Sequence, residues 1–153
     1  GLIGKVMFES AKVAISFIKE NYKLFGIDYE EFINSDIHIH VPEGSIPKDG
    51  PSAGTSIVTA IISNFTKLKV NNSIGFTGEI GLKGEVIEVG KLKEKAIGAI
   101  INGIDKIFLP FDNKDELKEL PKEIVNKIDF ILVKNYKEIF NYLKEINTTK
   151  DKN

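Results

Sequence analysis

The sequence lacks cysteine, arginine and tryptophan, and the absence of cysteine alone excludes several functions. Without it there are no disulfide bonds, no thiolate metal sites and no cysteine nucleophile. The 21 basic residues, all of them lysine, nearly balance the 22 acidic ones and leave a net charge of -1. Such a surface has no surplus of positive charge for a phosphate backbone, so we expect no nucleic-acid partner for this domain.

Long apolar runs are missing as well. No segment approaches the roughly 20 consecutive apolar residues of a membrane-spanning helix. The opening residues GLIGKVMFES do not have the charged and then apolar layout of a signal peptide, and we expect no membrane partner. The chain starts at Gly1 rather than Met and enters a helical pattern at once, so we expect it to be a piece of a longer protein.

The 153 residues, 42% of them hydrophobic and 28% charged, suit one globular domain. Apolar residues at three- and four-residue steps predict helices at 2–25, 53–65, 91–104 and 136–146. Alternating or short apolar runs predict strands at 36–41, 73–80, 84–89, 106–109 and 130–133. The second and third of these strands are predicted to form a hairpin. Two further segments, at 114–120 and 122–128, are amphipathic. We predict a single α+β domain over residues 3–146, followed by a frayed tail at 147–153.

A loop rich in proline and glycine spans residues 42–54 and ends beside a serine. Ser52 stands just before the predicted helix 53–65, where backbone N–H groups and the helix dipole can stabilise a developing oxyanion. This is a suitable setting for a nucleophile. The alternative is that Ser52 caps the helix, which is the commoner role of an isolated serine at such a position.

Two blocks of sequence carry a resemblance to a known family. The loop PEGSIPKDGPSAG resembles the serine loop of the Lon proteases, the ATP-dependent serine–lysine peptidases, and places their nucleophile at Ser52. The stretch TGEIGLKGEVIEVGKLKEKAIGA resembles the family's lysine-bearing block and places the general base at Lys95. The two blocks align with the family pattern without a gap between them. The resemblance covers most of the chain.

The resemblance implies the Lon proteolytic-domain fold, an α+β fold related to the second domain of a small-subunit ribosomal protein, here without its N-terminal strands. It implies a serine endopeptidase that degrades unfolded or damaged proteins. Longer relatives form hexamers and use ATP and magnesium in an ATPase module fused upstream. No GxxxxGK[ST] phosphate loop occurs in this sequence, so we expect no cofactor in this chain. The implied location is the cytoplasm of a bacterium or the mitochondrial matrix of a eukaryote.

A lysine base must be neutral, whereas a free lysine titrates near ~10.4. Desolvation against apolar walls would lower its pKa far enough. Helical spacing places Lys95 beside Leu92 and Ala99, at the edge of the apolar stripe. Without the resemblance, Lys95 would be read as a solvated surface residue, and periodicity alone would favour Lys93.

Several neighbours are candidates to support the pair. Thr77 matches the family's threonine, whose hydroxyl is expected to orient the lysine, although it also suits an ordinary strand. Glu79 and Asp49 either tune the site electrostatically or serve a turn or a surface ion pair. His38 and His40 form a rival hypothesis, as a metal pair or as the base of a triad. The resemblance implies a peripheral role for them and no metal site.

Two rival functions stay open at this point. A small-molecule kinase of the galactokinase–mevalonate kinase type has a phosphate loop that GPSAGTS resembles loosely. A Lon-like module without catalysis would only assemble or dock partners. The sequence also departs from the family once, because Gly90 is followed by Lys91 where the family commonly has two glycines. This departure predicts a different turn into the lysine-bearing helix.

Overall fold

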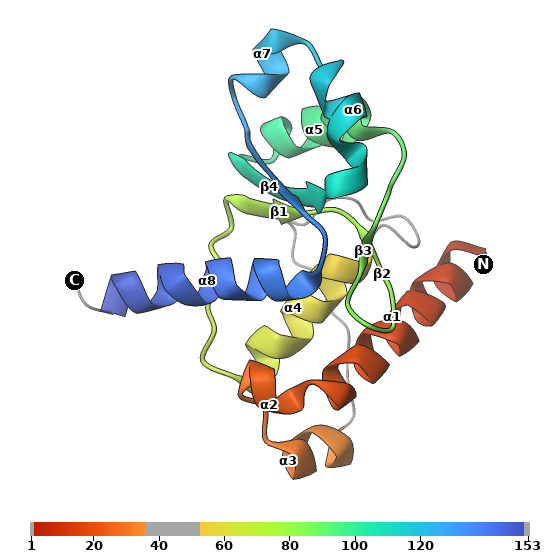
Figure 1. The fold of residues 1–153 in the computed structure, drawn as a ribbon, viewed down its shortest axis with the longest axis vertical. Helices are drawn as coiled ribbons and strands as arrows, with labels where there is room; N and C mark the ends of the chain where they lie inside the picture. The colour runs from red at the N-terminus through yellow and green to blue at the C-terminus, as the bar shows by residue number, and fades with distance from the viewer. Residues whose placement is uncertain (1, 36–52, 152–153) are drawn as a thin grey trace.

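The computed structural model describes residues 2–35 and 53–151 (Figure 1). The strand predicted at 36–41 and nearly all of the loop predicted at 42–54 lie outside the described residues. The described part contains a three-stranded parallel sheet, a two-stranded antiparallel sheet and helices on two sides of the larger sheet. The predicted α+β class is therefore confirmed.

The parallel sheet has the strand order β1-β4-β5, with β1 at Ile74–Phe76, β4 at Lys106–Pro110 and β5 at Asp129–Val133. Side chains alternate between the two faces of a strand. In β4, Phe108 therefore joins one apolar core while its neighbours Ile107 and Leu109 join another. Both predicted strands at 106–109 and 130–133 are confirmed.

The two cores lie on opposite faces of this sheet. The larger core is built with α1 (Leu2–Glu20), α4 (Gly54–Phe65) and α8 (Tyr136–Asp151). The smaller core is built with α5 (Leu92–Ile101) and α7 (Lys122–Val125), beside α6 (Lys114–Lys118). Figure 1 shows α4 and α8 on one side of β1 and β4, and α5, α6 and α7 on the other. The helices predicted at 53–65 and 91–104 are thereby confirmed, with α5 ending three residues earlier.

The predicted single strand at 73–80 is wrong, because the chain changes sheets within it. After β1, the strands β2 (Glu79–Ile80) and β3 (Val86–Ile87) form the antiparallel pair. Gly78 separates β1 from β2 at a φ of 149°. A β-carbon there would lie 2.7 Å from Val86 Cγ1, so only glycine fits the crossing. The predicted hairpin is confirmed only for the residues nearest its turn, which form β2 and β3.

The predicted helix at 2–25 is interrupted after Glu20. Asn21 donates its side-chain amide to the Phe17 carbonyl at 2.8 Å, and a second helix, α2, follows at Tyr22–Phe25. Gly26 ends α2 in the left-handed conformation that favours glycine, with φ 72°. The break comes from a side chain that competes with the backbone for a carbonyl, which apolar periodicity does not reveal.

The sequence-based prediction missed one short helix, α3 at Tyr29–Asn34. Asp28 caps it, since its carboxylate accepts a hydrogen bond from the Glu31 N–H at 3.1 Å. An aspartate followed three residues later by glutamate is a known start signal for helices. That signal was present in the sequence and could have located α3.

The last helix also differs from its prediction, because α8 continues to Asp151 instead of ending near residue 146. Asn147, the first residue of the expected frayed tail, accepts a hydrogen bond from the Lys69 N–H at 2.9 Å and donates to the Lys69 carbonyl at 3.0 Å. This contact to a distant segment holds the beginning of that tail in the fold.

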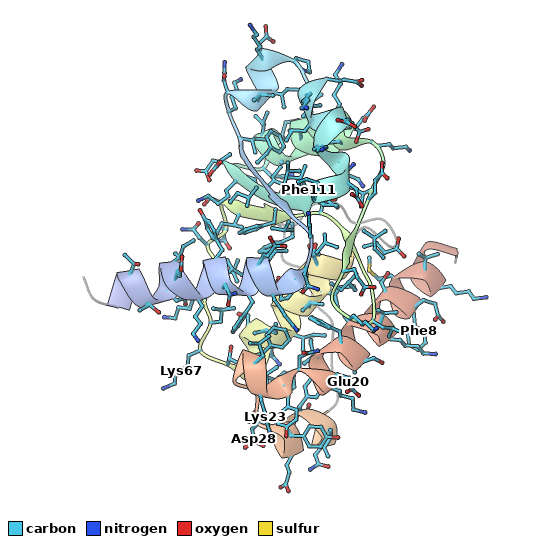
Figure 2. The ribbon with its side chains drawn as sticks, viewed as in Figure 1. Phe8, Glu20, Lys23, Asp28, Lys67 and Phe111 are labelled. Carbon is cyan, nitrogen blue, oxygen red and sulfur yellow. The ribbon has the colours of Figure 1, made fainter. Side chains whose placement is uncertain are left out.

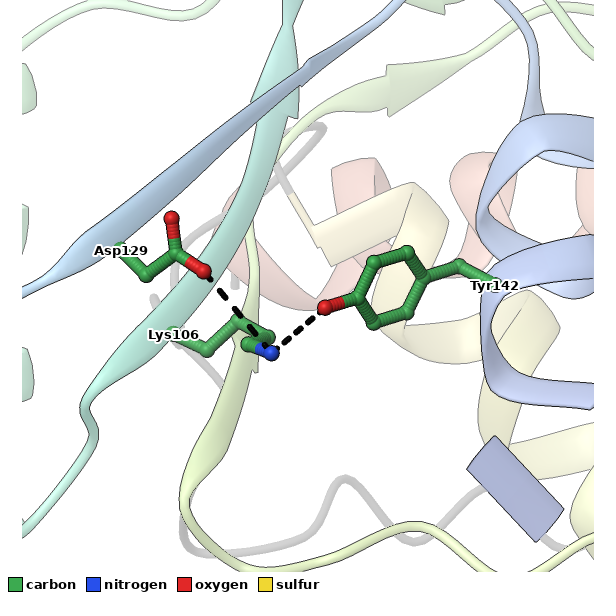
Figure 3. A network of polar contacts seen from close by, with 3 residues as sticks. All are labelled: Lys106, Asp129 and Tyr142. Carbon is green, nitrogen blue, oxygen red and sulfur yellow. Dashed lines mark hydrogen bonds and ion pairs between the residues drawn. The ribbon is translucent and has the colours of Figure 1, made fainter. Parts of the chain in front are cut away.

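A polar network ties α8 to the first residues of β4 and β5 (Figure 3). Lys106 donates to the Tyr142 hydroxyl at 2.6 Å and lies 3.8 Å from the Asp129 carboxylate. The hydrogen bond to Tyr142 raises the pKa of Lys106, against the opposing effect of burial. Because the Asp129 side chain is 64% exposed, the ion pair contributes at most ~1 kcal/mol.

The fully buried Tyr136 leads to a prediction about stability at high pH. Its hydroxyl is hydrogen-bonded to Thr59 Oγ1 at 2.7 Å, and burial raises the pKa of Tyr136. The neutral phenol therefore contributes stability below the unfolded pKa of about 10, and that contribution is lost as the pH rises further.

We expect Tyr136→Phe to cost about 1 kcal/mol at pH 7, since Thr59 keeps its bond to the Thr55 carbonyl. Above pH 10 the wild type should lose stability relative to the variant by up to ~1.4 kcal/mol per pH unit. Urea unfolding of both proteins at pH 7 and pH 11 measures this difference in stability. The lysines also titrate in this range, but their contribution is the same in both proteins and cancels. An unchanged difference at the two pH values would contradict the prediction.

Candidate functional site

The start of α4 is fixed against the segment that joins β1 to β2. The Thr55 N–H donates to the Gly78 carbonyl at 3.1 Å, outside the hydrogen bonds of the helix itself. Gly54 lies so close to β2 that a β-carbon there would be 2.6 Å from the Ile80 backbone nitrogen. The hydroxyl of Ser56, the residue after Thr55, donates to the Phe76 carbonyl at 3.4 Å. The first turn of α4 therefore has little freedom to move.

Four predicted site residues, Ser52, Asp49, His38 and His40, lie outside the described residues, and their roles stay predictions. Ser52 is joined directly to Ala53, which occupies the N-cap position of α4. An alanine has no side-chain acceptor, so the N-cap residue does not engage the N–H groups of the first turn.

Two buried hydroxyls mark the junction of α4 with the strands. Thr77 is 1% exposed, and its N–H donates to the Phe108 carbonyl at 3.0 Å. Its Oγ1 finds no hydrogen-bond partner among residues 2–35 and 53–151, and the same is true of Thr55 Oγ1. An unpaired buried hydroxyl costs roughly 1–3 kcal/mol. Such groups are rare in native proteins and often have a functional reason.

Sequence reasoning selected Thr77 and missed Thr55. The two residues belong to one small region, because the β-carbon position of Gly78, the residue after Thr77, lies 3.3 Å from Thr55 Cγ2. The available signal was a polar residue immediately after the Pro-Ser-Ala-Gly motif, in the first turn of a predicted buried helix. Thr55 therefore joins the list of site residues.

Lys95 lies one turn into α5, and its N–H donates to the Lys91 carbonyl at 3.1 Å. The buried face of α5 includes Leu92 and Ala96, with Lys95 half-buried at its edge as the spacing predicted. Lys93 is exposed. Lys95 is therefore the more sheltered of the two, whereas periodicity alone favoured Lys93.

The turn before α5 contains a residue in an unusual conformation. Lys91 caps α5 in the left-handed region at φ 56°, the only residue other than glycine with a positive φ in the described part of the chain. Non-glycine residues seldom adopt this conformation. The second glycine that the family commonly has would adopt it without strain. Lys91 instead holds the turn at an energetic cost that its surroundings must offset.

Glu79 is half-buried in β2, where it pairs with Ile87 of β3. It makes no ion pair with any residue of the described ranges. Within the same ranges, no three His, Cys, Asp or Glu side chains gather closely enough to hold a metal ion. Within the described ranges, contacts join the α4 N-terminus to the segment that carries Thr77, Gly78 and β2, while Lys95 lies on α5.

Comparison with known proteins gives strong matches over nearly the whole chain. Residues 1–145 match the family model of the Lon protease (S16) C-terminal proteolytic domain. The chain is 45% identical over 143 residues to the Lon protease of Mycoplasmopsis agalactiae, covering 94% of this chain and 14% of that protein. It is 50% identical over 141 residues to the Lon protease of Mycoplasma pneumoniae, covering 92% of this chain and 18% of that protein.

The fold and these matches define a proteolytic domain of the serine peptidase class. More particularly, the chain belongs to the family of Lon protease (S16) C-terminal proteolytic domains. The resemblance inferred from the two sequence blocks is confirmed. The chain spans less than a fifth of the length of the relatives named above, from 14% to 18%. None of the helices in the described ranges has both the length and the apolar character that a membrane crossing needs.

Proposed function

We propose that this domain hydrolyses peptide bonds with Ser52 as the nucleophile and Lys95 as the general base. The Ser52 hydroxyl attacks the scissile carbonyl carbon while the Lys95 amine takes its proton. The resulting ammonium returns a proton to the departing amine, and an acyl–serine ester forms. Water then attacks the ester, passes a proton through Lys95 to the serine oxygen, and releases the acid product.

The observation that carries this proposal is the contact between the α4 N-terminus and the strand segment at Thr77. The bond from the Thr55 N–H to the Gly78 carbonyl fixes the backbone only three residues after Ser52. The first N–H groups of a helix have no intrahelical partners, and the helix dipole makes that end positive. A nucleophile that leads directly into such an end has donors nearby for the oxyanion of the tetrahedral intermediate.

The remaining residues are assigned supporting roles. The buried Thr77 hydroxyl makes no hydrogen bond within the described residues, and its proposed role is to orient the Lys95 amine by forming one during the reaction. Glu79 on β2 adjusts the electrostatic potential at the site, and Asp49 is given the same role. His40 is placed at the periphery of the site.

The wider role follows from family membership. We infer that the substrates are unfolded or damaged polypeptides and that the domain acts within a hexamer of a longer chain. ATP and magnesium would be bound by an ATPase module of that longer chain, and the proteolytic domain would need no cofactor of its own. The kinase alternative is not proposed, because the family shown is the Lon proteolytic domain.

A serine-directed probe tests the proposal. A fluorophosphonate that bears a short peptide should form a covalent adduct at Ser52 in the wild type, located by peptide mass spectrometry. Ser52→Ala should abolish labelling, while Ser73→Ala, a half-buried serine outside the site, should leave it intact. Equal labelling of Ser52→Ala and wild type would overturn the assignment. A wild type that stays unlabelled would favour the non-catalytic module.

A further inference from the structure

A buried asparagine clamps the backbone that leads into the Lys95 helix. Asn113, 1% exposed, lies at the end of the 3-10 helix η2 (Phe111–Asn113), which directly follows β4. Its Oδ1 accepts from the Val89 N–H at 3.1 Å, and its Nδ2 donates to the Val89 carbonyl at 2.8 Å. The side chain thus pairs with both backbone groups of one residue, as a neighbouring strand would.

Val89 needs this partner because it lies between β3 and α5, outside both strand pairings. It is 8% exposed, so its backbone groups have little access to water. Buried backbone donors and acceptors are nearly always paired in native structures, because leaving them unpaired is costly. The amide of Asn113 fills this requirement and fixes the chain three residues before α5 begins.

The strained turn at Lys91 lies between two anchors. On one side, Asn113 holds Val89, and on the other Leu92, 1% exposed, packs into the smaller core. A non-glycine residue at φ 56° persists only where the surrounding structure enforces it. Lys95 lies one turn beyond, hydrogen-bonded through its N–H to the Lys91 carbonyl. Loosening the Val89 anchor therefore frees the first turn of α5.

The segment that carries Asn113 is itself well fixed. The ammonium groups of Lys134 and Lys114 lie 4.5 Å and 5.0 Å from the centre of the Phe111 ring, which Figure 2 shows beside the sheet. Asn113 Nδ2 also lies 3.2 Å from Glu116 Oε1 on α6. These contacts make η2 a rigid support for the clamp.

Thr77 and the entry to the Lys95 helix are therefore both held by groups on β4 or just after it. The Phe108 carbonyl in β4 holds the Thr77 N–H, and Asn113, three residues after the end of β4, holds the entry to α5. We propose that Asn113 is a positioning residue that sets the location of the Lys95 amine relative to Thr77 and the α4 N-terminus. The catalytic meaning of this role rests on the proposed function, whereas the placement of the amine does not.

The test compares two variants at Asn113 with two matched controls. Asn113→Ala removes the clamp, and Asn113→Asp keeps the acceptor for the Val89 N–H but cannot donate to the Val89 carbonyl when ionised. Asn147 makes the same pair of bonds, to the backbone of Lys69, from α8 on the opposite side of the sheet (Figure 1). Asn147→Ala and Asn147→Asp thus make the same changes in a clamp of the same bonding pattern, at a more exposed position away from α5.

Three measurements are made on each variant of the 153-residue chain. Hydrogen exchange measures how often the first turn of α5 opens. The reaction rate of the Lys95 amine with an amine-reactive reagent, relative to that of the exposed Lys93, measures how sheltered the amine is and does not require activity. The maximal rate of Ser52 labelling, separated from probe binding, reports catalysis. Circular dichroism establishes that each variant is folded.

We expect both Asn113 variants to exchange faster in α5, to bring the reactivity of Lys95 towards that of Lys93, and to slow maximal labelling by roughly a hundredfold with probe binding unchanged. The Asn147 variants should match wild type in all three measurements. A folded Asn113 variant with wild-type α5 exchange and Lys95 reactivity overturns the inference. So does the unfolding of both Asn113 variants where the Asn147 variants stay folded, because Asn113 would then support the whole fold.

The two proposals fail in different ways. If Ser52→Ala is labelled like the wild type, or the wild type is not labelled, the proposed chemistry is wrong, while the exchange and amine data still decide the role of Asn113. If labelling depends on Ser52 but the Asn113 variants behave like their Asn147 controls in every measurement, only the positioning role is wrong.

Discussion

Lys95→Met should slow the covalent labelling of Ser52 by roughly a thousandfold, because a general base contributes about 10²–10⁴-fold. Methionine is unbranched and matches the length and apolar stem of lysine, so the half-buried position on α5 stays filled. Only the amine that accepts the serine proton is lost. The measured quantity is the maximal labelling rate with the peptidyl fluorophosphonate, with circular dichroism to establish the fold.

The matched control is Lys93→Met, on the same helix at an exposed position. Its labelling rate should stay within about twofold of wild type, since exposed substitutions away from a site have small effects. If Lys95→Met labels at the wild-type rate, the lysine base is wrong. Loss of labelling in His40→Ala together with a fully active Lys95→Met would instead support the histidine as the base of a triad.

Gly54→Ala is expected to damage both stability and activity. The added β-carbon would lie 2.6 Å from the Ile80 nitrogen and 2.9 Å from its Cγ2, and the backbone atom cannot rotate away. Relief requires α4 to withdraw from β2, which strains the bond between the Thr55 N–H and the Gly78 carbonyl. We expect a loss of roughly 1–3 kcal/mol in the free energy of unfolding, as for other overpacked sites.

The labelling rate of this variant should fall even where the variant is fully folded, because the shifted turn directly follows Ser52. At a denaturant concentration where the variant remains folded, its labelling rate should drop by roughly a hundredfold, the effect of a displacement near 1 Å. Gly98→Ala, in α5, is the control, because no atom of the described residues beyond the helix's own backbone lies within 4 Å of its added β-carbon. It should raise the free energy of unfolding by about 0.5–1 kcal/mol. Equal stabilities of the two variants in urea would contradict the close contact at Gly54.

Long elements with one clear apolar face were predictable from the sequence. The helix at 53–65 and the strand at 106–109 are correct because each pattern repeats for several residues and fixes which side is buried. Lys95 was also placed correctly at the edge of its helix face. Local patterns of this kind depend only on residues that are near in sequence.

Elements that depend on a distant partner were not predictable in the same way. Nothing within 73–80 shows that β1 pairs with β4 in parallel while β2 turns back to β3, since both halves have strand-like composition. The continuation of α8 past residue 146 follows from a hydrogen bond to the distant Lys69, whereas the interruption at Asn21 follows from a local bond to the Phe17 carbonyl. Periodicity does not register such bonds.

The sequence by itself determined the family, through two motif blocks, and with it the candidates Ser52 and Lys95, because the chemistry of a site requires particular residue types in a particular order. Only the tertiary structure decided that α4 begins against β2, that the Thr55 and Thr77 hydroxyls are buried without partners among the described residues, and that Asn113 holds the entry to α5. These contacts join segments far apart in the chain. They arise when the two cores pack on opposite faces of one sheet, and no local pattern encodes them.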